Sequence, residues 1–166
     1  ISSISKMYCA AAVMLLVDDG QVSLDQPVTA YIPDFTMADG RYKDITVRML
    51  LNHTSALPGT IEYGVEGTVY NKEFARDFLE VMSKSHLKHN PGEMAPYCND
   101  GWTLAEILVV RVSGKSYMDF LNERVFKPLS IKNTWFSVGV RQYDKGVTPA
   151  NIYAADGREE TLEVIS

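Results

Sequence analysis

The 166-residue sequence has only two cysteines, Cys9 and Cys98, and no apolar run of about 18 residues. Two cysteines are too few for a disulfide framework, so we expect two buried thiols. Without a long apolar run, no transmembrane segment is expected. The formal charge of −5 provides no basic surface for nucleic acid, so a nucleic-acid partner is not expected. No signal-peptide pattern is present either, which leaves export open.

The composition is that of a globular protein, with 46% hydrophobic and 22% charged residues. Its length suits one domain with a substantial core. Periodicity and turn residues predict a mainly helical region over residues 1–132 and a tail rich in strands and hairpins over residues 133–166. The expected helices cover residues 3–19, 47–52, 72–82 after an Asn71 cap, and 101–112, which Ser113-Gly114 closes. A last helix is capped by Ser116 and ends before Pro128. Strand-like pieces occupy residues 134–138 and 146–148, and residues 152–154 and 161–165 flank an Asp156-Gly157 turn.

Ser3 and Lys6 begin the first of these helices. Residues three apart lie on one face of a helix, so the Lys6 amine can reach the Ser3 hydroxyl. A serine hydroxyl is a poor nucleophile until a neighbouring base takes its proton, and a lysine with a lowered pKa can be that base. The helix is apolar nearly all round, which predicts a buried central helix that ends at Asp18-Asp19-Gly20. The alternative is that Ser2 or Ser3 caps the helix and Lys6 is solvated.

A second candidate motif, Tyr97-Cys98-Asn99, lies between an Asn90-Pro91-Gly92 turn and the start of a predicted helix. A tyrosine in such a loop can point into a cleft and relay a proton when cations hold its pKa down. The amide of Asn99 can bind both Lys6 and a substrate carbonyl. The alternative is a packed tyrosine followed by a turn asparagine.

Together the two motifs resemble those of the serine beta-lactamase and penicillin-binding-protein superfamily, in its class C beta-lactamase, D-alanyl-D-alanine carboxypeptidase and esterase branch. The similarity continues in order through most of the chain. It includes residues 24–28 (LDQPV), 31–35 (YIPDF), 45–59 (ITVRMLLNHTSALPG), 112–117 (VSGKSY) and 128–134 (PLSIKNT).

The resemblance implies an acyl transfer through a covalent intermediate on Ser3, with Lys6 and Tyr97 moving the proton and Asn99 orienting the acyl group. It implies no cofactor and no metal. The expected substrate is a beta-lactam, a peptidoglycan stem peptide or other D-amino-acid peptide, or an ester. Relatives mostly act outside the cytoplasm, which suggests a cell-envelope or secreted protein.

The sequence also departs from this family. Its third motif, Lys-Thr-Gly or His-x-Gly on a strand, is absent from the 166 residues, and we expect it beyond Ser166. Ala56 stands where glycine is usual, and Ser130 where glycine is common. We therefore expect a partial domain: mainly α with a minor β portion, the helical lobe of an α/β beta-lactamase/transpeptidase-like fold without most of its central sheet. Such a chain is expected to be inactive alone.

The alternative to an enzyme is a non-catalytic helical module that binds a partner or self-associates. Without a covering sheet, one apolar face of the first helix is left for a homo-oligomer contact. Its residues are Met7, Ala11, Met14 and Leu15. Two further features are interpreted as structural. His86 and His89 lie three apart in a polar turn and are expected to be solvated, with no ligand set for a metal. The resemblance implies that His53 ties its own loop with a hydrogen bond.

Overall fold

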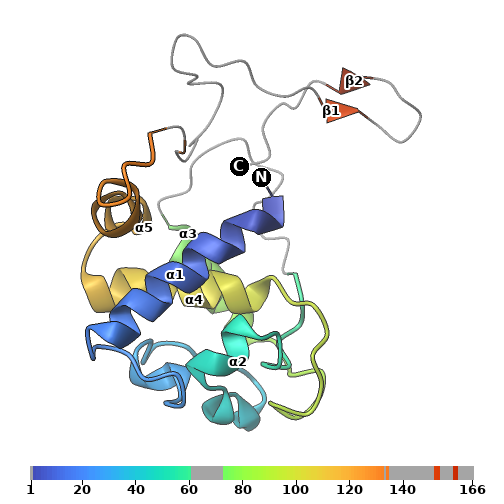
Figure 1. Cartoon of the computed structure of the whole chain (residues 1–166). Helices are drawn as coiled ribbons and strands as arrows, with labels where there is room; N and C mark the ends of the chain where they lie inside the picture. Colours follow the sequence, from blue (N-terminus) through green and yellow to red (C-terminus); the bar gives the residue numbers. More distant parts are fainter. Residues whose placement is uncertain (1, 61–72, 133, 135–151, 154–158, 161–166) are drawn as a thin grey trace.

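The computed structural model describes residues 2–60, 73–132, 134, 152–153 and 159–160, and these form mainly helices (Figure 1). The α-helices are α1 (Ser5–Asp18), α2 (Val47–Leu51), α3 (Phe74–Ser83), α4 (Asp100–Ser113) and α5 (Tyr117–Leu121). Shorter helical turns are η1 (Ser2–Ile4), η2 (Val28–Ala30), η3 (Gly40–Asp44) and η4 (Asn122–Phe126), and two short strands are β1 (Ile152–Tyr153) and β2 (Glu159–Glu160). The prediction of a mainly α chain with a minor β portion is confirmed.

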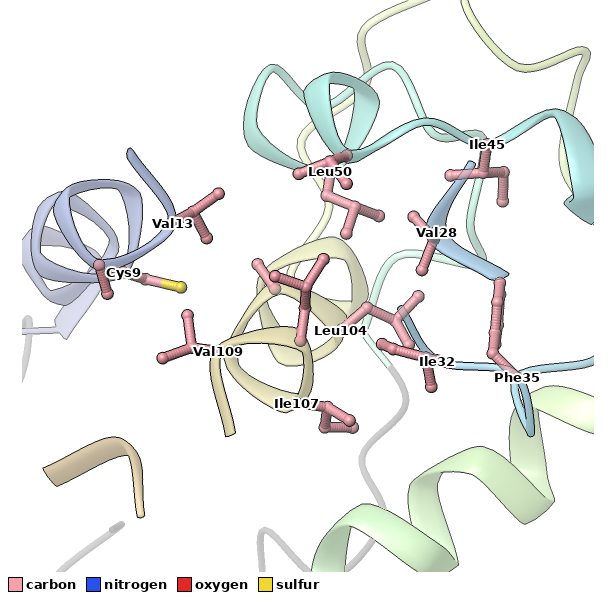
Figure 2. Close-up of a cluster of buried hydrophobic side chains, with 14 of the residues drawn as sticks. Cys9, Val13, Val28, Ile32, Phe35, Ile45, Leu50, Leu104, Ile107 and Val109 are labelled. Atoms are coloured by element: carbon pink, nitrogen blue, oxygen red, sulfur yellow. The ribbon is translucent and has the colours of Figure 1, made fainter. Parts of the chain in front are cut away.

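Helix α4 is the centre of the core. It packs against α1 on one side and α2 on the other, and Figure 2 shows its Leu104 between α1 and the connection that carries Val28 and Ile32. Leu104 and Leu108 are fully buried. The helix ends at Gly114, whose φ of 67° is a left-handed C-cap conformation that glycine adopts without a steric penalty. The expected helix over residues 101–112 is therefore confirmed to within a residue at each end.

Helix α1 is buried only on the face that packs against the core, and the apolar face that was expected to lack a covering sheet is partly exposed. Its buried residues are Cys9, Ala12, Val13 and Leu16, which join the core beside α4. Met7 is 71% exposed and Met14 is also exposed. A uniformly apolar helix has no polar stripe to indicate the covered side, so only packing decides which face is buried.

Two other helices differ from their predicted bounds. Helix α3 begins at Phe74, whereas the predicted cap Asn71 and the predicted first residue Lys72 lie outside the described residues. After α5 the chain continues through the π-helical turn η4, so the helical path ends at Phe126, before Pro128 as expected. Ser116 caps α5 as predicted, because its Oγ accepts the backbone N–H of Asp119 at 3.1 Å.

The two short strands form an antiparallel pair, with Ile152 opposite Glu160 and Tyr153 opposite Glu159. A hairpin around Asp156-Gly157 was expected, but its second strand comes earlier than residues 161–165, which lie outside the described residues. Residues 135–138 and 146–148, expected as strands, also lie outside them. Among the helices that the structure describes, none is both long and apolar enough to span a bilayer.

Candidate active site

Three predicted site residues meet at one oxygen atom. Lys6 Nζ donates a hydrogen bond to Ser3 Oγ at 2.9 Å, and Tyr97 Oη lies 2.5 Å from the same Oγ. Lys6 Nζ also lies 4.9 Å from the centroid of the Tyr97 ring. Ser3 is in the 3-10 turn η1, which leads directly into α1, so the α-helix itself starts at Ser5 and not at about Ser3 as predicted. Ser3 and Lys6 are nevertheless about one helical turn apart, as predicted.

Lys6 also changes the titration of Tyr97. Hydrogen bonding from Lys6 and then from Ser3 lowers the pKa of the Tyr97 phenol, although the residue is 58% exposed. A donor that favours the charged form stabilises a phenolate. The Ser3 hydroxyl is thus within hydrogen-bond distance of a phenol whose deprotonated form, the one that can act as a base, exists at a lower pH than in an ordinary tyrosine.

The loop that contains His53 holds Tyr97 in place. The His53 ring stacks on the Tyr97 ring with centroids 4.7 Å apart and planes 30° apart. His53 Nδ1 accepts the backbone N–H of Cys98 at 3.0 Å, which puts the proton of a neutral ring on Nε2. The family resemblance implied that His53 ties its own loop with a hydrogen bond, whereas its Nδ1 accepts from Cys98 in another loop. The stacking on Tyr97, 44 residues away along the chain, was not predicted.

Gly59 and Asp100 form a second set of contacts, a hydrogen-bonded clamp on the Tyr-x-Asn segment. Neither residue was predicted from the sequence to have this role. The Gly59 carbonyl accepts the backbone N–H groups of Asn99 at 2.6 Å and Asp100 at 3.1 Å. In return, Asp100 Oδ2 accepts the Gly59 N–H at 2.7 Å, and Asp100 is only 2% exposed. Buried carboxylates in proteins are paired. An aspartate directly after the Tyr-x-Asn motif was therefore the one feature of the sequence that could have indicated this contact.

The Asn99 side chain lies beside the cluster but makes a different contact from the one expected. Its Nδ2 donates to Thr60 Oγ1 at 3.1 Å. Among the described residues, the expected hydrogen bond between Asn99 and Lys6 is absent, yet both line the same open pocket of about 260 Å³ between α1 and α4. Trp102, Glu106 and Tyr117 also line this pocket.

The two cysteines are free and buried, as predicted. Burial raises the pKa of the Cys9 thiol to about 12, and burial also raises the pKa of Cys98. Cys98 occupies the variable position of the Tyr-x-Asn motif, and its thiol packs into the core. Neither thiol is in a form that favours nucleophilic attack.

The histidine pair at residues 86 and 89 differs from its prediction. His89 is only 8% exposed, and its Nδ1 donates to the carbonyl oxygen of Asn90 at 2.8 Å, so the expectation of a solvated side chain is wrong for this residue. His86 is exposed. Over the described ranges, no group of three or more His, Cys, Asp or Glu side chains is arranged to hold a metal ion.

Comparison with known proteins shows the family to which this chain belongs. The described helices match the helical lobe of the beta-lactamase/transpeptidase-like fold, the fold of serine beta-lactamases and penicillin-binding proteins. The Beta-lactamase family model matches residues 1–163, and the chain therefore belongs to the beta-lactamase family. The family and the fold class predicted from the sequence are both confirmed.

Two curated relatives are similar over most of this chain. "Protein flp" of Staphylococcus aureus strain MW2 is 30% identical over 138 residues, which cover 82% of this chain and 27% of that protein. "Penicillin-binding protein 4*" of Bacillus subtilis strain 168 is 28% identical over 170 residues, which cover 97% of this chain and 35% of that protein. The chain thus spans about a third of the length of these relatives.

Two solved structures are similar in fold. A D-amino acid amidase from Ochrobactrum anthropi SV3, complexed with L-phenylalanine amide, is 33% identical with a TM-score of 0.67, covering 81% of this chain and 36% of that one. The octameric penicillin-binding protein homologue from Pyrococcus abyssi is 29% identical with a TM-score of 0.71, covering 96% of this chain and 37% of that one. Both likenesses agree with the family assignment.

Proposed function

We propose that this chain supplies the nucleophile and the proton-transfer groups of a serine acyl hydrolase. The observation that carries the proposal is the position of Ser3 Oγ, 2.9 Å from Lys6 Nζ and 2.5 Å from Tyr97 Oη. Such an arrangement, a nucleophile within hydrogen-bond reach of a base that a third group orients, is what covalent acyl transfer needs. Its substrate is an amide, a beta-lactam, a D-amino-acid peptide or an ester.

In this mechanism Ser3 Oγ attacks the substrate carbonyl carbon while its proton passes to the Tyr97 phenolate. Lys6 donates to Ser3 Oγ and lowers the pKa of Tyr97, so the phenolate forms more readily. When the tetrahedral intermediate collapses, Tyr97 returns the proton to the leaving amine or alcohol, and Ser3 keeps the acyl group as an ester. Water then attacks this ester by the same route and releases the acid.

The developing oxyanion needs backbone donors. The Ser3 N–H is one of them, because η1 places it at the start of the helical path of α1. We place the second donor on the strand that carries the third motif in this family. Loss of one such donor costs about 10²–10³ in rate, so residues 1–166 by themselves are expected to acylate slowly or not at all. Asn99 remains the candidate for orienting the acyl group, by exchanging its Thr60 partner for substrate.

The test is covalent labelling of Ser3 in the whole protein. A fluorescent penicillin and a fluorophosphonate probe should each label the native protein, and peptide mass spectrometry should locate the adduct on Ser3. Ser3→Ala should abolish labelling. The control is Ser23→Ala, which removes an exposed hydroxyl from the connection after α1 and should label normally. Labelling that persists in Ser3→Ala, or that is absent with both probes, would refute the proposal.

A second candidate function is self-association, and one observation favours it. Met7, Met14 and Leu129 are exposed, and an apolar groove of about 360 Å³ runs between α1 and the segment after α5, where Leu15 and Val125 also line it. Exposed apolar patches on soluble proteins mark contact surfaces. Sedimentation of the 166-residue chain should show oligomers that Met14→Lys dissociates. A folded chain that sediments as a monomer would rule this function out.

A further inference from the structure

The pocket beside Ser3, Lys6 and Tyr97 extends along two helices, α1 and α4. Lys6 and Cys9 contribute to it from successive turns of α1, and Asn99 and Glu106 from the N-cap and the second turn of α4. The Cys9 thiol lies 4.0 Å from the carbonyl oxygen of Trp102, and the negative charge of Glu106 contributes to the raised pKa of Cys9, so Cys9 and Glu106 are near each other. The pocket therefore has a near end at Lys6 and Asn99, next to the nucleophile, and a far end at Cys9 and Glu106.

The two ends differ in charge. Lys6 occupies the near end, where its ammonium already pairs with Ser3. At the far end Glu106 is the one carboxylate among the described lining residues. Although Glu106 is accessible, the protein packed around its carboxyl displaces water and raises its pKa. A desolvated carboxylate gains more from a cationic partner than a fully hydrated one does.

The other titratable groups at the far end also disfavour an anion. Burial, with the negative charge of Glu106, raises the pKa of Cys9, and burial likewise raises the pKa of Tyr117. Both groups are therefore neutral when Glu106 is charged. The rings of Trp102 and Tyr117 complete the walls, and aromatic faces attract cations. An acidic group flanked by aromatic rings matches a primary ammonium, and its charge repels a carboxylate.

We propose that this pocket binds an ammonium group at the end of a side chain on the acyl part of the substrate, with Glu106 as its counter-ion. The inference rests on the proposed function, because it assumes that the acyl group sits at Ser3. Seven residues separate Asn99 from Glu106, which is about 10 Å along a helix. That spacing fits an amine at the end of a lysine-like chain. It excludes an amine on the carbon next to the scissile carbonyl.

A matched pair of substrates tests the specificity. The whole protein is assayed with the p-nitrophenyl esters of 6-aminohexanoic acid and of 6-hydroxyhexanoic acid, which differ only in the terminal group. The native protein should prefer the amine ester by about tenfold in kcat/KM, the effect of one charge-assisted hydrogen bond. Glu106→Gln should abolish the preference, so that the two esters react at equal rates. Glu80→Gln, on the exposed surface of α3, should retain the preference. Equal rates for both esters in the native protein would overturn the proposal.

A binding measurement separates this inference from the proposed catalysis. Binding of 6-aminohexanamide to the protein is followed by NMR line broadening, which needs no turnover, and circular dichroism verifies that each variant is folded. The native protein should bind this amine, and Glu106→Gln should not, whereas Glu106→Asp should bind it weakly. Absence of binding to the native protein, or equal binding to Glu106→Gln, would refute the pocket even if Ser3 is labelled. Binding without Ser3 labelling would leave the pocket intact and refute the acyl transfer.

Discussion

The ring of His53 lies against the ring of Tyr97, with centroids 4.7 Å apart, while His53 Nδ1 accepts the backbone N–H of Cys98. One side chain thus fixes both the backbone and the ring of the Tyr-x-Asn segment. His53 does so from a left-handed conformation, with φ of 66°, which points its ring back across the loop. Because Tyr97 is exposed, this contact supplies much of its positioning.

Replacement of His53 should therefore affect Tyr97 more than the fold. His53→Ala removes the stacked ring and the acceptor for Cys98, and it places alanine at positive φ, so we expect slower Ser3 labelling by up to about 10²-fold and a loss of about 1–2 kcal/mol in stability. His53→Asn is the matched variant, since asparagine tolerates positive φ and keeps an acceptor oxygen. It should restore most of the stability but not the labelling rate. Equal labelling rates in all three proteins would contradict the positioning role.

The pH dependence of labelling should report Tyr97. Its lowered pKa means that the phenolate becomes available at a lower pH than for an ordinary tyrosine, so the labelling rate should rise with pH and level off early. Lys6→Met removes the largest cause of the shift and should move this rise to higher pH. Tyr97→Phe should reduce the rate by about 10²–10⁴-fold and flatten the profile. Rates are measured with a fluorophosphonate between about pH 6 and pH 10. A rise at the same pH in Lys6→Met would contradict the assignment.

The clamp between Gly59 and Asp100 should contribute to stability. Asp100→Ala leaves the buried N–H of Gly59 without the acceptor it has at 2.7 Å, which costs about 1–3 kcal/mol in the free energy of unfolding. Asp100→Asn keeps an acceptor oxygen at the same place and should cost less. Urea unfolding of the three proteins measures the difference. If Asp100→Ala is as stable as the native protein, the clamp has no energetic role.

Ser130 should gain from becoming glycine. It has a φ of 54°, and the chain around it forms a Schellman motif, with Ile131 N–H donating to the Phe126 carbonyl and Ser130 N–H to the Lys127 carbonyl. Ser130→Gly should raise the free energy of unfolding by about 1 kcal/mol, because glycine has no steric penalty at positive φ.

A glycine-to-alanine substitution at another residue with positive φ is the control for Ser130→Gly. Gly114 has a φ of 67°, and an added Cβ there would contact nothing within 4 Å, so Gly114→Ala tests backbone conformation alone. It should lower stability by about 1 kcal/mol. Thermal unfolding measures the stability of both variants. A stability change of the same sign in both would contradict a steric penalty at positive φ.

The thiols should resist alkylation in the folded protein. Burial raises the pKa of Cys9 to about 12, so at neutral pH this thiol is protonated as well as inaccessible, and Cys98 is buried too. Iodoacetamide should leave both unmodified until guanidinium unfolds the chain, and mass spectrometry counts the adducts. Because the folded pKa of Cys9 is the higher one, its contribution to stability should be lost as the pH rises toward 12. Rapid modification of Cys9 in the native protein would contradict this burial.

The sequence predicted the local relationships well. Ser3 and Lys6 are one helical turn apart, so their contact depends on a short segment whose backbone geometry is known beforehand. The caps at Ser116 and Gly114 are equally local, because each satisfies backbone groups a few residues away. The family motifs also identified the helical lobe, because their order can be seen in the sequence itself.

By itself, then, the sequence predicted most of the helices, the contact between Ser3 and Lys6, and the family. Tertiary structure alone decided that Tyr97 Oη lies 2.5 Å from Ser3 Oγ across 94 residues of chain, and that His53 stacks on Tyr97. Local rules come from backbone geometry and short-range hydrogen bonds, whereas these outcomes depend on how distant segments pack, and packing is a property of the whole fold.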